Sequence, residues 1–60
     1  MFKDKLKQAR LKTGLSQAKL ADALGVPLRT YESWERGLRT PAVYVQTALL
    51  QQIEQLNAEK

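Results

Sequence analysis

The sequence contains no cysteine and no histidine, and each absence removes a class of function. Without cysteine there are no disulfides and no thiolate zinc sites. Without histidine the chain lacks the commonest metal ligand and the usual acid–base catalyst near neutral pH. We therefore expect no metal site, no cofactor and no catalytic residue, and we do not expect an enzyme.

Long hydrophobic runs are also missing, and no apolar stretch approaches the roughly 18 residues of a membrane span. The first ten residues alternate charged and apolar side chains, unlike the hydrophobic region of a signal peptide. No membrane partner is predicted, and a cytoplasmic location is the default expectation. With 60 residues, the chain is expected to form one domain, 1–60, near the lower size limit for independent folding.

Only three glycines and two prolines interrupt the chain, and they predict where helices end and begin. Gly14, Gly25 and Gly37 follow helix-like stretches, where a left-handed residue ends a helix at little steric cost. Pro27 and Pro41 stand where a helix can start. No strand-like alternation occurs, so the fold class is predicted to be all-α. A compact four-helix domain is expected, with a fifth helix left open, and the helices span about 3–12, 17–24, 28–35 and 41–57.

Apolar residues at helical spacing mark the inner face of each predicted helix. Val26 is placed to fill the corner after the second helix, whereas Leu11 faces away from the first helix's inner side and has no assigned partner. The expected core residues are Phe2, Leu6, Ala9, Leu20, Ala21, Leu24, Tyr31, Trp34, Ala42, Val45, Leu49, Ile53 and Leu56.

The net charge of +4 is distributed unevenly along the chain. Residues 1–40 carry nine basic and four acidic side chains, whereas residues 41–60 carry one basic and two acidic side chains. A basic surface on part of a small domain is typical of proteins that face nucleic-acid phosphates. Charge alone is also compatible with a basic, soluble protein that binds no nucleic acid.

The linker between the second and third predicted helices is only three residues long, Gly25 to Pro27. A glycine-started turn this short forces the two helices to cross steeply, which is the arrangement of a helix-turn-helix unit. An ordinary corner in a helical bundle has the same spacing, so spacing alone leaves both interpretations open.

Two stretches, residues 16–26 (SQAKLADALGV) and 29–37 (RTYESWERG), resemble the lambda-repressor-like helix-turn-helix family, the Cro and Xre group. The shared features include an arginine in the first helix, Arg10, a Ser-Gln opening, Gly-Val at the turn and a closing Glu-x-Gly. The resemblance extends from about Leu6 to Leu50. It implies a regulator that binds double-stranded DNA and reads the major groove with helix 28–35.

The outer face of that helix, opposite the two aromatic residues, supplies the candidate base contacts. Arg29 is suited to bidentate contact with guanine O6 and N7. Ser33 can donate or accept; Glu32 can accept from cytosine N4 or remain solvated or ion-paired. Leu28 can cover a thymine methyl or pack against the turn. The predicted base contacts are therefore Leu28, Arg29, Glu32 and Ser33.

The family resemblance also implies contacts away from the bases. Gln17, in the first turn of its helix, is expected to reach a phosphate, and a helix N-terminus favours an anion there. Arg36 and Arg39 are further candidate phosphate contacts, with a solvated charge as the alternative for either. The resemblance implies that Arg10 and Glu35 pair between the first and third helices, which we interpret as structural.

The last segment, 41–60, has a wider apolar arc than one core contact requires. Val43, Tyr44 and Leu50 lie outside its core stripe and are predicted to form a homodimer or partner surface, although a frayed tail beyond Gln51 is the alternative. The preferred hypothesis is a homodimeric repressor on a pseudo-palindromic operator.

Two other functions are kept open. One is an antitoxin-like autoregulator that binds its own promoter and a toxin partner, since residues 35–41 resemble the tails of Xre-type antitoxins and small bacterial regulators. The other is a protein-interaction domain that has lost DNA affinity. The basic first two thirds and Arg29 argue against this last hypothesis.

Overall fold

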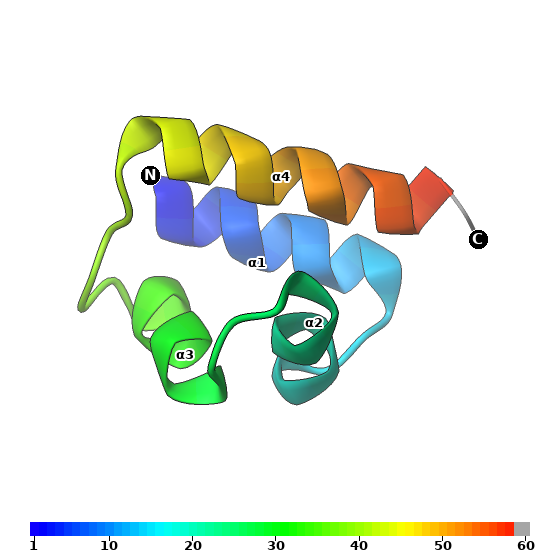
Figure 1. Ribbon diagram of the computed structural model, residues 1–60, viewed down its shortest axis with the longest axis horizontal. Helices are drawn as coiled ribbons and strands as arrows, with labels where there is room; N and C mark the ends of the chain where they lie inside the picture. Colours follow the sequence, from blue (N-terminus) through cyan, green and yellow to red (C-terminus); the bar gives the residue numbers. More distant parts are fainter. Residues whose placement is uncertain (59–60) are drawn as a thin grey trace.

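The computed structural model describes residues 1–58, which form four helices and, within that range, no strand. The helices are α1 (Phe2–Thr13), α2 (Gln17–Leu24), α3 (Leu28–Arg36) and α4 (Val43–Ala58). Figure 1 shows α1 and α4 running side by side in the same direction, with α2 and α3 forming a second layer beneath them. The all-α prediction is confirmed, and no fifth helix is present among the described residues.

The turn between α2 and α3 has the geometry that its sequence predicts. Gly25 adopts a left-handed conformation with φ of 75°, and its N–H donates to the Asp22 carbonyl. Pro27 follows in an extended conformation and precedes the first residue of α3. At the other end of α2, the Ser16 hydroxyl accepts a 3.2 Å hydrogen bond from the backbone N–H of Lys19, which is the predicted N-cap.

The start of α4 differs from the prediction. The helix begins at Val43, two residues after Pro41, and the Ala42 carbonyl accepts the first backbone hydrogen bonds, from Val45 and Gln46. The Gln46 side chain also donates to the Pro41 carbonyl at 2.8 Å, which holds the entering loop. Because Ala42 precedes the helix and is exposed, its predicted place in the core is wrong.

Each helix contributes two buried apolar residues to one continuous core. The core aromatic residues Tyr31 and Trp34 meet edge to face, with ring centroids 6.5 Å apart. Leu11 is exposed, as expected for a residue with no assigned partner. The eight buried residues are Phe2, Leu6, Leu20, Ala21, Tyr31, Trp34, Leu49 and Ile53, and all of them belong to the predicted core.

Candidate nucleic-acid interface

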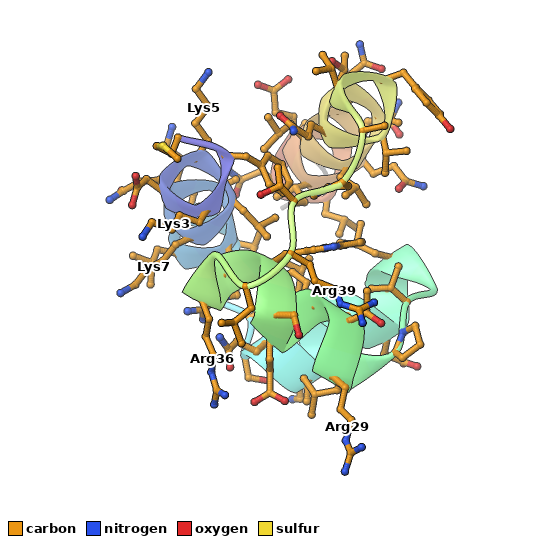
Figure 2. The ribbon with its side chains drawn as sticks, turned by 90° about the vertical axis from the view of Figure 1, so that its left-hand side faces the viewer. Lys3, Lys5, Lys7, Arg29, Arg36 and Arg39 are labelled. Atoms are coloured by element: carbon orange, nitrogen blue, oxygen red, sulfur yellow. The ribbon has the colours of Figure 1, made fainter. Side chains whose placement is uncertain are left out.

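Helix α3 is held by its aromatic side and leaves its opposite side exposed. Tyr31 is fully buried and Trp34 nearly so, and since they lie three residues apart they fix the rotation of the helix about its axis. Arg29 and Arg36 leave the helix on the far side and point away from the body of the protein (Figure 2). The outer face of α3 is therefore open to a partner at both ends, at Arg29 and at Arg36.

Two of the candidate base-contacting residues are exposed at the start of α3. Arg29 projects into solvent and, within residues 1–58, forms no ion pair that would compete for its guanidinium. Leu28 is 42% exposed, so part of its apolar surface is open to contact. Both side chains have the freedom that base-edge contact requires.

The other two candidates, Glu32 and Ser33, are half-buried on the same helix. The Ser33 hydroxyl donates a 3.0 Å hydrogen bond to the Arg29 carbonyl, one helical turn earlier. In this conformation its proton is engaged with the backbone, so Ser33 can offer a base only its lone pairs. Ser33 can therefore accept a hydrogen bond from a base but cannot donate one in this conformation.

Glu35 links the inner side of α3 to both neighbouring helices. Arg10 Nε donates to Glu35 Oε2 at 2.8 Å and its Nη2 donates to Oε1 at 3.5 Å, while Gln17 Nε2 donates to Oε1 at 3.1 Å. The Arg10 and Glu35 side chains are only 15% and 6% exposed. Arg10 makes a third hydrogen bond, from Nη1 to the Leu15 carbonyl at 3.2 Å, which connects the pair to the loop before α2.

These contacts keep both groups charged. Burial alone would raise the pKa of Glu35, but the hydrogen bonds from Arg10 and Gln17, together with the nearby Tyr31 hydroxyl, outweigh burial and lower it. The hydrogen bond to Glu35 raises the pKa of Arg10. The pKa of Tyr31 is raised, first because burial disfavours the phenolate and then because the Glu35 carboxylate lies nearby.

Gln17 occupies a different environment from the one its sequence position implies. It is half-buried, and its amide is bonded to Glu35. Sequence reasoning missed this contact, because it assigned Gln17 to a DNA phosphate and only Glu35 to Arg10. Buried Thr13 was missed as well: its hydroxyl donates to the Arg10 carbonyl at 2.6 Å and accepts from the Leu15 N–H at 3.1 Å, which shapes the loop that leads to Gln17.

The two candidate phosphate-binding arginines lie on different sides of α3. Arg36 is exposed in the last turn and points to the same lower side as Arg29 (Figure 2). Arg39 is also exposed, but it leaves the loop between α3 and α4 toward the opposite side from Arg36. The structure therefore groups Arg29 with Arg36 and separates Arg39 from both.

The three candidate dimer residues on α4 are not equivalent. Val43 and Tyr44 are 75% and 79% exposed, whereas Leu50 is half-buried and packs against the core. Leu50 also lines a groove between α1 and α4, together with Ile53. Leu38, which was not predicted as a surface site, is an exposed apolar residue in the preceding loop.

A comparison with protein families supplies the identity of this architecture. The family model described as "Helix-turn-helix" matches residues 6–45, two thirds of the chain. The chain belongs to the Cro/C1-type helix-turn-helix family. It is thus a DNA-binding transcription regulator domain with the lambda-repressor-like all-α fold.

The other comparisons and a search for membrane segments add no further assignment. No curated protein and no solved structure matches this helix-turn-helix domain. None of the helices in the part of the chain described here has the length and apolar character needed to cross a bilayer.

Proposed function

We propose that this helix-turn-helix domain represses transcription by binding a pseudo-palindromic operator as a homodimer. The observation that carries the proposal is the outer face of α3: Arg29 projects freely while buried Tyr31 and Trp34 fix the helix behind it. A rigid helix with a free arginine fork is suited to reading guanine in the major groove. Occupying promoter DNA in this way blocks transcription, and such a regulator acts in the cytoplasm.

The homodimer is supported by the end of the molecule where α3 finishes and α4 begins. Val43 and Tyr44 are exposed there, and Figure 1 shows the C-terminal end of α3 and the N-terminal end of α4 at this end of the molecule. The longest dimension of the protein is 30 Å. Two copies in contact can therefore place their recognition helices about 34 Å apart, one turn of B-DNA, as a two-fold operator requires.

Selection of bound sequences from a random DNA library tests the proposal. We expect an enriched motif with two-fold symmetry and half-sites about 10 base pairs apart. Sedimentation of the protein with and without the selected DNA gives the stoichiometry. A single, non-palindromic site bound by a monomer would refute the dimer, and no enrichment at all would refute sequence-specific recognition.

The antitoxin-like autoregulator is the second candidate. The same exposed Val43 and Tyr44 favour it, together with the groove between α1 and α4, because a protein partner could cover both. Co-purification from the native host separates the two candidates. A stoichiometric toxin bound through α4 would support the autoregulator, whereas a homodimer without another partner would support the repressor.

A further inference from the structure

The N-terminal half of α1 carries exposed lysines that take no part in the core. Lys3 and Lys7 are exposed and four residues apart, so they share one face of α1. Lys3 lies in the first turn of α1, where positive charge opposes the helix dipole, so it does not stabilise α1 in that way. Lys7 lies beyond that turn and, within the described residues, forms no ion pair. Their placement calls for a role outside the helix.

The fold brings this face of α1 next to the end of α3. A β-carbon at Gly37, the residue that ends α3, would lie 3.0 Å from Lys3 Cδ and 3.6 Å from Lys3 Nζ. The lysine side chain therefore lies across the C-terminal end of α3, beside Arg36. In Figure 2, Lys3 and Lys7 leave α1 toward the left, in the same half of the view as Arg36, which points down from α3, whereas Lys5 points up, away from α3.

The charges on this side are not neutralised by the protein itself. In the described part of the chain, Lys3, Lys7 and Arg36 form no ion pair: Asp4 is 3.7 Å from the N-terminal amine, and Glu35 is bound to Arg10. We call these three exposed cations on neighbouring elements the α1 basic stripe. Such a surface attracts a polyanion.

The position of the stripe relative to α3 indicates which polyanion it meets. Arg29 and Arg36 are separated by about 10 Å along the helix axis, at 1.5 Å per residue. The major groove is about 12 Å wide, so with Arg29 at the base edges Arg36 lies near the groove wall, where the phosphates run. Lys3 lies beside the end of α3, and Lys7 follows it about 6 Å further along α1.

We infer that Lys3 and Lys7 extend the DNA contact surface from α3 onto α1, where each neutralises a backbone phosphate beyond the one that Arg36 reaches. The inference rests on binding of duplex DNA by this domain. It does not require the operator, the repressor role or the homodimer. The contacts add affinity for any sequence, because phosphates carry no direct sequence information.

The test is the salt dependence of binding to a 20-base-pair duplex of random sequence, measured by fluorescence anisotropy between 50 and 200 mM salt. The logarithm of the binding constant falls linearly with the logarithm of the salt concentration, with a slope of about −0.9 for each phosphate that is neutralised. Over this fourfold range the wild type should therefore lose about 3.5-fold more affinity than Lys3→Gln or Lys7→Gln, and about 12-fold more than the double variant.

Lys5→Gln is the matched control, since it removes the same charge from the same helix on the side facing away, and it should keep the wild-type slope. Lys7→Arg retains the charge and should keep the slope as well. Because Lys3 packs on Gly37, circular dichroism first establishes that Lys3→Gln is folded, and Lys7→Gln tests the stripe without that contact.

Slopes for Lys3→Gln and Lys7→Gln that equal the Lys5→Gln slope would overturn the inference while leaving DNA binding intact. A wild type that binds no duplex at 50 mM salt would overturn both the inference and DNA binding. If Lys3→Gln and Lys7→Gln weakened binding to poly-glutamate but not to DNA, the stripe would serve an acidic protein, and the inference would be wrong.

Discussion

Replacing Glu35 by alanine removes the residue that connects three helices, and the structure allows its cost to be worked out. The variant loses two hydrogen bonds from Arg10 and one from Gln17. It also leaves the Arg10 guanidinium largely buried and without its carboxylate. Removing one partner of a buried ion pair costs about 3–5 kcal/mol.

The lower end of that range applies here. The Arg10 side chain is 15% exposed and retains its bond to the Leu15 carbonyl, so its charge is partly solvated after the substitution. We therefore expect a loss of about 3 kcal/mol. The free energy of unfolding is about 0.05–0.15 kcal/mol per residue in small proteins, so a chain of this length has only about 3–9 kcal/mol in total. Glu35→Ala should thus remove a third or more of the stability.

Thermal unfolding followed by circular dichroism measures this loss, and the single tryptophan, Trp34, provides an independent fluorescence probe in the core. For a domain of this size, 1 kcal/mol corresponds to about 4–8 °C, so Tm should fall by about 12–24 °C. DNA affinity, measured at a temperature where the variant is folded, should change less. A fall in Tm below about 4 °C, or less than 1 kcal/mol, would refute the reasoning.

Five other substitutions test the remaining assignments. Arg29→Ala should weaken specific binding by about 1–3 kcal/mol and relax preference at one base pair; an equal loss on random DNA would contradict base contact. Gln17→Ala and Arg39→Ala should each weaken binding to all DNA sequences alike. Only Arg39→Ala should reduce the salt slope, by about 0.9, because it removes a charge. Only Gln17→Ala should lower Tm, because it removes the hydrogen bond to Glu35. The lowered pKa of Glu35 gives stability that is present above the ordinary value of 4.5 and is lost as pH falls below it, so Glu35→Gln should flatten the acid side of a Tm-against-pH curve. The raised pKa of Tyr31 gives stability that is lost as pH rises above the ordinary value of 10.0, and Tyr31→Phe should abolish that alkaline loss.

The helices and the core could be read from the sequence because each depends on local spacing. Gly25 and Ser16 set the ends of α2 through their own backbone preferences and side-chain reach. The start of α4 was misplaced because proline is compatible both with the first helical turn and with the loop before it. The hydrogen bonds of Gln46 and Ala42 decide between the two, and they depend on how the loop from α3 enters.

The candidate site was predictable only in part, for a related reason. A helical wheel shows that Arg29 faces away from Tyr31, and this needs no knowledge of other helices. The bond from Gln17 to Glu35 joins residues 18 positions apart, and its existence depends on the crossing of α2 and α3. Leu50 likewise looks superfluous on a wheel of α4, yet the broad contact between α1 and α4 half-buries it.

The cluster of Arg10, Gln17 and Glu35 raises the question of why a charged pair occupies a place where apolar residues could pack. Replacing a buried pair with apolar residues of similar volume is often neutral or stabilising, so stability alone does not require it. A hydrogen-bonded pair is directional, however, and this one fixes α3 relative to α1, while Gln17 binds the same carboxylate from the N-terminus of α2. We therefore expect the double variant Arg10→Met, Glu35→Leu to recover most of the Tm lost in Glu35→Ala and yet to discriminate less between the selected motif and random DNA. A double variant with wild-type discrimination would show that the pair only fills space, and one with the Tm of Glu35→Ala would show that the site cannot accept apolar side chains.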